Sequence, residues 1–290
     1  MNIYAGCRFP MKFTKMHGIG NDYIYVNAFE EQVEDPSALA IAISDRHFGV
    51  GGDGLVMICP SDVADFRMRM FNADGSEGDM CGNASRCVAK YVYDRGLTNK
   101  TTVTLETPAG IKTLMMNVID GQVASVRVDM GEPKLLCEDV PCTLGTGVVK
   151  MAPITALDRT FYITPVCTGN PHGVIVLEEP VEAFDLYKYG PVLETHPSFP
   201  KKANIEFVNV LAPDRIRMRV WERGSGVTLA CGTGSCAALV ACHENGLCGR
   251  KATVVLDGGE LVDEWDEETG HVFMNGPAAF VFDGTYDMHR

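Results

Sequence analysis

No stretch of this sequence is long and apolar enough to cross a membrane. The longest apolar runs, such as residues 236–242, fall well short of the roughly 20 residues that a membrane-spanning helix needs. Residues 1–10 also lack the apolar segment of a secretory signal, and the first strand pattern begins only at Met11. We therefore expect a cytoplasmic protein that does not contact membranes, in which residues 1–10 are an extension outside the fold.

Basic residues are in the minority, and the cysteines show no pairing pattern. The chain has 25 Lys and Arg against 38 Asp and Glu, a formal net charge of -13. Such a chain repels phosphate groups, which excludes nucleic acid as an expected partner. The 11 cysteines are odd in number and never spaced as CxxC, which argues against a disulfide framework, a zinc ribbon or a dedicated redox enzyme. We expect no metal site and mostly reduced cysteines.

What the sequence does contain is an internal repeat, at an offset of about 150 residues. Segments of the second half match segments of the first in the same order. The matched pairs are residues 20–26 with 169–177, 64–71 with 213–221, 81–89 with 231–239, and 101–110 with 252–260. A chain of 290 residues is also long enough to form two cores. We infer two similar domains related by duplication.

Each half contains several short strands and at least one helix, which predicts an α+β fold and not a doubly wound sheet. Apolar residues recur at helical spacing over residues 84–92 and predict an amphipathic helix that Gly96 ends. The matching helix, from Ser235 to Gly246, is apolar on nearly all sides, which indicates burial inside its domain.

Two cysteines, Cys81 and Cys231, stand at matching positions just before these helices. Two residues later comes a residue type that caps helices, Asn83 in one repeat and Thr233 in the other. The unpaired N–H groups and the dipole of a helix start favour a thiolate, so we expect both thiols to have lowered pKa values.

A matched pair of reactive thiols suits one reaction in particular. Taken singly, each cysteine could be no more than a buried packing residue. Two thiols that meet between two domains can instead remove a proton from one face of a carbon and return one to the other face, which inverts a stereocentre. The helix N–H groups, which a ligand approaches closely at Gly82 and Gly232, form a site for the carboxylate next to that carbon.

Six motifs carry a resemblance to a known family. They are KMHGIGNDY at 15–23, FNADGSE at 71–77, MCGN at 80–83, GNPH at 169–172, WERGSG at 221–226 and ACGTG at 230–234. With these motifs the chain resembles the diaminopimelate epimerase family from Met11 to about Gly284. The resemblance implies an isomerase that interconverts LL- and meso-diaminopimelate without pyridoxal phosphate or another cofactor, for lysine and peptidoglycan precursors.

The resemblance also implies an architecture. The family fold has two similar α+β domains, each a strand-rich, barrel-like layer around a central helix, with the active site in the cleft between them. The last strand returns to the first domain. We therefore expect an N-terminal domain of residues 1–130 plus 273–290 and a C-terminal domain of residues 131–272.

The resemblance assigns roles residue by residue. Cys81 and Cys231 match the two acid/base thiols. The substrate-binding residues that it implies are Asn21, Asn72, Gly82, Asn83, Asn170, His172, Asn204, Glu222, Arg223, Gly232 and Thr233. Those next to the two cysteines hold the reacting carboxylate, and most of the others bind the distal end of the substrate. Gly54 stands where some members carry a Gln that contacts substrate, so this contact is absent or replaced here.

Three alternatives remain open. A related racemase could act on another amino acid, such as histidine, although Glu222 and Arg223 favour a substrate with a second amino-acid group. A thiol-redox protein could use Cys81 and Cys231 as a switch. An NAD enzyme is suggested by the GxGxxG pattern at 49–54, but a strand pattern follows it where a helix is needed. The small-molecule substrate is the expected partner, and a homodimer is compatible with the sequence.

Overall fold

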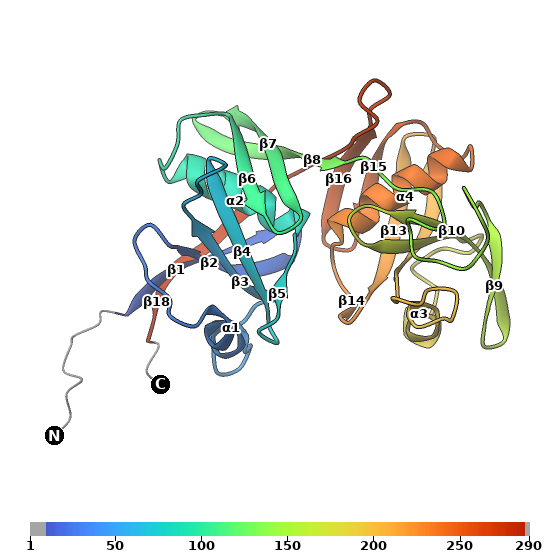
Figure 1. The fold of residues 1–290 in the computed structure, drawn as a ribbon, viewed down its shortest axis with the longest axis horizontal. Helices are drawn as coiled ribbons and strands as arrows, with labels where there is room; N and C mark the ends of the chain where they lie inside the picture. Colours follow the sequence, from blue (N-terminus) through green and yellow to red (C-terminus); the bar gives the residue numbers. More distant parts are fainter. Residues whose placement is uncertain (1–9, 288–290) are drawn as a thin grey trace.

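The computed structural model describes residues 10–287, so the expectation that residues 1–10 form an extension falls almost wholly outside the described residues. Within that part of the chain, eighteen strands join one continuous hydrogen-bonded sheet that forms two lobes (Figure 1). Each lobe encloses one long helix and carries one short helix outside. The α+β prediction is confirmed.

The first lobe contains β1 (Met11–Gly18), β2 (Asn21–Asn27), β3 (Gly54–Cys59), β4 (Phe66–Asn72), β5 (Glu77–Gly78), β6 (Thr102–Thr107), β7 (Gly110–Ile119), β8 (Gln122–Gly131) and β18 (Ala279–Tyr286). Its helices are α1 (Pro36–Ser44) and α2 (Gly82–Asp94). In its sheet, β18 pairs with β1 and β1 pairs with β2, both in antiparallel fashion. Strand β2 then pairs with β3 in parallel, and β3 pairs with β4 in antiparallel fashion. The sheet continues from β4 to β6 in parallel and ends with β6-β7-β8.

The second lobe contains β9 (Ala152–Ala156), β10 (Arg159–Cys167), β11 (Pro171–Val176), β12 (Asn204–Ala212), β13 (Arg215–Glu222), β14 (Gly226–Val227), β15 (Lys251–Leu256), β16 (Gly259–Trp265) and β17 (Val272–Gly276). Its helices are α3 (Leu186–Glu194) and α4 (Gly232–Glu244). Its pairings repeat those of the first lobe one by one, including the two parallel pairs, β11 with β12 and β13 with β15. The duplication read from the sequence is confirmed at the level of topology.

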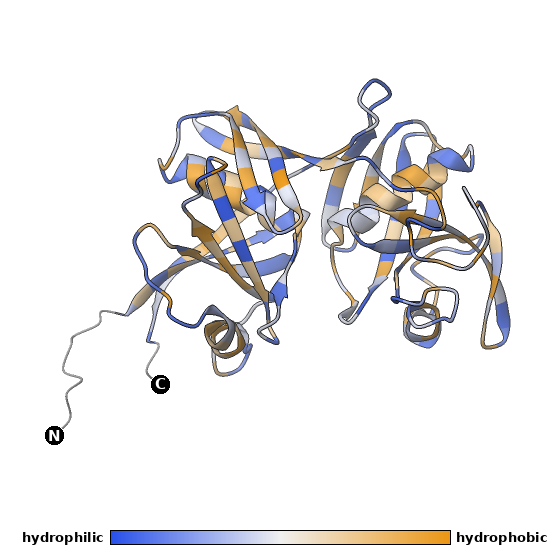
Figure 2. Cartoon of the chain, viewed as in Figure 1, coloured by the Kyte–Doolittle hydropathy of each residue, from blue (hydrophilic) through white to orange (hydrophobic). Residues whose placement is uncertain are grey.

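The two long helices are buried because the strands curve around them. Residues of α2 pack on β1, β7 and β8, and those of α4 pack on strands from β10 to β17. Figure 2 shows hydrophobic residues along α4, as its apolar sequence predicts. One large apolar cluster includes both helices, so the centres of the two lobes are continuous.

The lobes join through β8 and β17, which pair with each other in antiparallel fashion. The last strand, β18, pairs with β1 and lies in the first lobe. We propose the division 1–130 plus 273–290 and 131–272, which the place of β18 supports. This division assigns β17 to the first domain, whereas the pairing of β17 with β16 repeats that of β8 with β7 and places β17 in the second lobe. The boundary at residue 272 falls at the start of β17, a strand that pairs with strands of both lobes.

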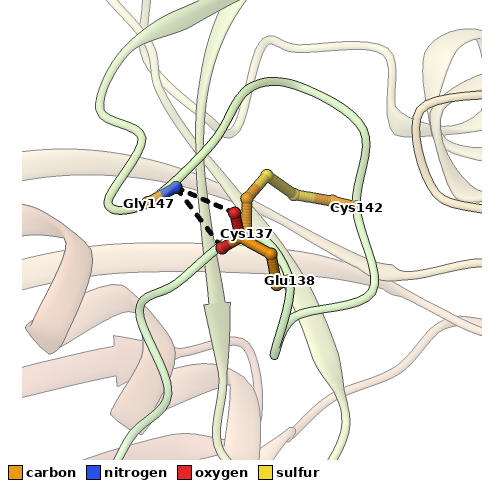
Figure 3. Close-up of a disulfide and its surroundings, with 4 residues drawn as sticks. All are labelled: Cys137, Glu138, Cys142 and Gly147. Carbon is orange, nitrogen blue, oxygen red and sulfur yellow. Dashed lines mark hydrogen bonds between the residues drawn. A yellow bond between two sulfur atoms is a disulfide. The ribbon is translucent and has the colours of Figure 1, made fainter.

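The cysteines differ from the expectation at one place. Cys137 and Cys142, in the segment between β8 and β9, form a disulfide (Figure 3). In the same loop the backbone N–H of Gly147 donates to the carboxylate of Glu138, at 3.2 Å. Four intervening residues are not a disulfide signature, so the sequence spacing had no means of indicating this bond. The other cysteines among residues 10–287 are free, as expected for most of them.

Candidate active site

Cys81 and Cys231 occupy the same structural position in the two lobes. Each is the N-cap of its buried helix and has an extended backbone, with φ and ψ of -135° and 117° at Cys81 and of -122° and 106° at Cys231. The expectation that Asn83 and Thr233 would cap the helices is wrong. Both residues lie in the first helical turn, because the helices begin directly after the cysteines. The backbone N–H of Ala84 therefore points to the Cys81 sulfur, at 3.4 Å.

The two helix starts face each other across the junction of the lobes. The Asn83 side chain donates from Nδ2 to the backbone oxygen of Ala230, the residue before Cys231, at 3.2 Å. Met274 of β17 packs against both helix starts. A Cβ atom at Gly82 would lie 2.6 Å from its Cε atom, and one at Gly232 would lie 2.8 Å from its sulfur. Glycine at these positions therefore lets both helices pack closely on one methionine.

The structure contradicts the expected lowering of the thiol pKa values. Burial raises the pKa of Cys81 to about 11, although the N–H groups of Ala84 and Asn83 act in the opposite direction. Burial, followed by the charges of Glu222 and Glu206, raises the pKa of Cys231 well above its ordinary value. The N–H groups at the helix starts stabilise the thiolates, but the loss of hydrating water on burial destabilises the thiolates by a larger amount. The raised pKa values favour the protonated form of both thiols at neutral pH.

In the first lobe, Asn21 contacts the Cys81 thiol. Its amide oxygen accepts from the sulfur at 3.4 Å, and its Nδ2 donates to Oδ2 of Asp53 at 2.8 Å. The same Asp53 oxygen accepts the backbone N–H of Asp22 at 3.0 Å. The other Asp53 oxygen accepts from Arg46 at 2.9 Å. This network fixes which end of the Asn21 amide faces the thiol.

In the second lobe, the expected residues Asn170 and His172 form a buried chain that leads to a residue not expected from the sequence. The Nε2 atom of His172 lies 2.7 Å from Oδ1 of Asn170, and its Nδ1 atom lies 2.6 Å from Oε1 of Glu206. The side chains of His172 and Glu206 are both 0% exposed. The available signal for Glu206 was a single charged residue inside the apolar strand sequence NIEFV.

The expected distal-end residues lie around these two clusters. Glu222, at the end of β13, accepts from the Thr228 hydroxyl, and burial raises its pKa. Its charge acts on both thiols, since it raises the pKa of Cys81 and of Cys231. Asn204 is buried, and its Oδ1 accepts the backbone N–H of Arg223 at 2.8 Å.

Three further expected residues have local partners. The exposed Arg223 guanidinium donates to the backbone oxygen of Lys201 at 3.2 Å, and Asn72 donates to the Ser76 hydroxyl at 2.9 Å. The backbone oxygen of Thr233 accepts from Thr168. The roles of all these residues in binding substrate stay predictions.

Gly54, the first residue of β3, has no room for a side chain. A Cβ atom there would lie 2.0 Å from the backbone oxygen of Phe71 and 2.8 Å from the Tyr23 ring. The contact that a Gln makes in some members of the family therefore has no equivalent at this position on the present backbone.

Within residues 10–287, no group of three or more His, Cys, Asp or Glu side chains is placed to hold a metal ion. None of the helices described there is long and apolar enough to cross a membrane.

Comparison with known proteins identifies the relatives of this chain. The family model for diaminopimelate epimerase matches residues 13–136 and 164–281. The diaminopimelate epimerase of Acetivibrio thermocellus is 56% identical over 97% of this chain and 100% of its own, and that of Methanococcus maripaludis strain C5 is 55% identical over 96% and 100%.

Solved structures share the fold at low identity. A phenazine biosynthesis protein of the PhzF family from Bacillus anthracis has a TM-score of 0.71 at 19% identity, covering 97% of this chain and 100% of its own. A hydroxyproline epimerase from Agrobacterium vitis has a TM-score of 0.67 at 17% identity, covering 97% and 93%. With a family model over most of its length and relatives above 50% identity, the chain belongs to the diaminopimelate epimerase family.

Proposed function

We propose that this chain is an isomerase that interconverts LL- and meso-diaminopimelate, with Cys81 and Cys231 as its two acid/base groups and with no cofactor. The observation that carries the proposal is the placement of one cysteine at the same helix N-cap in each duplicated lobe, on helix starts that contact each other. Membership of the family names the substrate.

The chemical step needs one thiolate and one thiol. The thiolate takes the α-hydrogen from one face of the substrate as a proton, so that an S–H bond forms and the C–H bond breaks. The electron pair passes to the α-carbon and its carboxylate. The opposite thiol then gives its proton to the other face, a new C–H bond forms, and the negative charge ends on that second sulfur. The reverse reaction begins from this state.

The raised thiol pKa values give the substrate a role in making the thiolate. The α-ammonium brings a positive charge next to buried thiols, and an opposite charge nearby lowers the pKa of a thiol. The N–H groups at both helix starts, around Gly82 and Gly232, are available to the reacting carboxylate, where charge develops in the transition state. Exclusion of water strengthens both interactions.

The polar residues outside the two helix starts are assigned to substrate binding, most of them at the distal end of the substrate. They are Asn21, Asn72, Asn170, His172, Asn204, Glu222 and Arg223. The partly buried carboxylate of Glu222 suits an ammonium, and the exposed guanidinium of Arg223 suits a carboxylate. Histidine has no second amino-acid group, so this set favours diaminopimelate over histidine.

The test is exchange of the α-hydrogen. The protein is incubated with LL-diaminopimelate in deuterium oxide, and we expect meso product with deuterium at the α-carbon. Cys81→Ser and Cys231→Ser should each abolish turnover while circular dichroism stays unchanged. Cys59→Ser, at a free cysteine that ends β3, is the matched control and should stay active. Absence of both exchange and meso product would refute the proposal, and exchange with histidine alone would favour the racemase.

We also propose a cytoplasmic homodimer that binds neither nucleic acid nor membranes. The support for a dimer is β18, which among the described strands pairs with β1 alone and exposes Val281 and Phe282. An edge strand with exposed apolar residues is a ready surface for pairing with a second copy. Light scattering should give twice the chain mass, and Phe282→Glu should give a monomer. A monomeric unmodified chain would refute this part alone.

A further inference from the structure

Two asparagines stand at matching positions of the duplicated lobes, each directly after a glycine in the left-handed region. Gly20, with φ of 89°, precedes Asn21 at the start of β2. Gly169, with φ of 102°, precedes Asn170, just before β11. The two amides therefore begin from equivalent backbone positions, and any difference in how they point comes from their partners.

The amide of Asn21 is held by its NH2 group. Its Nδ2 donates to Asp53 at 2.8 Å, and a carboxylate can only accept. Asp53 is itself fixed at the same oxygen by the backbone N–H of Asp22. The oxygen of Asn21 is consequently turned toward the site, where the Cys81 thiol lies 3.4 Å away.

The amide of Asn170 is held by its oxygen, which lies 2.7 Å from Nε2 of His172. For that nitrogen to donate, it must carry a hydrogen, and Glu206 ensures that it does. Burial raises the pKa of Glu206, which favours the protonated carboxyl form as the donor to Nδ1 over 2.6 Å. A ring that accepts at Nδ1 carries its hydrogen on Nε2. The NH2 group of Asn170 is consequently the end turned away from the histidine.

The first lobe has no equivalent of this chain. By the register of β2 with β3 and of β11 with β12, His172 corresponds to Tyr23 and Glu206 corresponds to Val56. A small residue in α4 also makes room for Glu206. A Cβ atom at Gly234 would lie 2.7 Å from its Oε1 atom, whereas the first lobe has Ala84 there. The second lobe thus differs from the first at several positions that together form, or make room for, this one hydrogen-bonded chain.

We propose that Glu206 is a positioning residue for substrate recognition, which acts through His172 to present the NH2 group of Asn170, whereas Asp53 presents the oxygen of Asn21. The two equivalent asparagines then recognise groups of opposite hydrogen-bonding character. Asn21 accepts from an ammonium or a thiol, and Asn170 donates to a carboxylate. This assignment rests on the proposed function only for the identity of the substrate.

The hydrogen-bonded chain can be tested without any activity. Long-range ¹H–¹⁵N NMR of the full-length protein distinguishes protonated from unprotonated histidine nitrogens. We expect Nε2 of His172 to be protonated at neutral pH, and Glu206→Val to release the ring into a mixture of tautomers. An unprotonated Nε2 in the unmodified protein would overturn the proposal, even if the protein proves to be a diaminopimelate epimerase.

Kinetics separate positioning from a merely structural role. Glu206→Val should raise KM for diaminopimelate about tenfold or more, the effect of one lost hydrogen bond to a carboxylate, and should change kcat much less. Glu206→Gln keeps a hydrogen-bonding partner for Nδ1 and should recover most of the affinity. Glu179→Gln, which removes a charge from a surface ion pair with Arg159, is the matched control and should leave both constants unchanged.

Each kinetic outcome decides one point. An unchanged KM in folded Glu206→Val would overturn the proposal, as would equal effects of the Val and Gln variants. If Glu206→Val does not fold, two measurements still test the proposal. They are the protonation of the His172 ring nitrogens in the unmodified protein and the KM of Glu206→Gln. If the unmodified protein does not turn over diaminopimelate, the proposed function fails, while the NMR result continues to test the hydrogen-bonded chain.

Discussion

Gly234→Ala is expected to damage the second half of the site selectively. The new Cβ atom would lie 2.7 Å from Oε1 of Glu206 and 3.1 Å from the Cys231 sulfur. Glu206 is fully buried and bonded to His172, so it cannot move aside without breaking that contact. The oxygen contact is about 0.5 Å too short, and overpacking of this kind costs about 1 to 3 kcal/mol.

Two effects oppose each other in this variant, and their sizes decide the outcome. Alanine restricts the unfolded chain more than glycine does, which stabilises by up to about 1 kcal/mol. The overpacking cost is larger, so we expect a fall in Tm of about 5 °C. Displacement of the Cys231 sulfur by a fraction of an ångström should lower kcat by about 10- to 100-fold.

The assay compares thermal unfolding and α-hydrogen exchange in Gly234→Ala with those in Gly249→Ala. A Cβ atom at Gly249 would meet nothing closer than 3.7 Å, so the control should behave like the unmodified protein. A Gly234→Ala protein with unchanged Tm and unchanged kcat would show that the contact between Glu206, Cys231 and the helix start does not exist as described.

Three further predictions concern the thiols and the junction. Because burial raises the pKa of Cys81 to about 11, its thiolate fraction should increase about tenfold per pH unit below that value, so kcat/KM should rise from pH 7 to pH 9. A pH profile that is flat over this range would contradict the raised pKa. Met274→Ala should destabilise by about 2 to 5 kcal/mol in denaturant unfolding, because it empties the space that both helix starts share; a loss below 1 kcal/mol would contradict this packing. Reduction of Cys137–Cys142, which closes a short loop, should cost at most about 2 kcal/mol and leave kcat unchanged, and a loss of turnover in mild reductant would be the contrary result.

The duplication and the two cysteines could be predicted from the sequence because they depend on order and spacing. The sequence predicts that Gly96 ends the helix after Cys81, and the helix ends at Asp94, with Gly96 at a φ of 75°. The matching helix begins three residues before the expected Ser235. Capping preferences alone placed the caps at Asn83 and Thr233, but the extended backbone at the cysteines makes them the caps.

The thiol pKa values and the role of Glu206 could not be predicted, since both depend on burial in three dimensions. A helix start is visible in a sequence, whereas the amount of water removed from a sulfur is not. Glu206 has no partner near it in the sequence, because His172 lies 34 residues away and reaches it through a parallel pair of strands. The same applies to Met274, which meets two glycines from different halves of the chain.

The pairing of β8 with β17 has a consequence for the stereochemistry. These strands are equivalents in the two lobes, and they pair in antiparallel fashion with each other, as equivalent strands do across the axis of a symmetric dimer. The chain thus contains an internal approximate twofold axis, close to which the two helix starts meet. In the proposed reaction, an axis lying in the plane of the carbanion would exchange its two faces and so place equivalent thiols on opposite sides of the reacting carbon. The groups away from the axis would then distinguish the ends of the substrate.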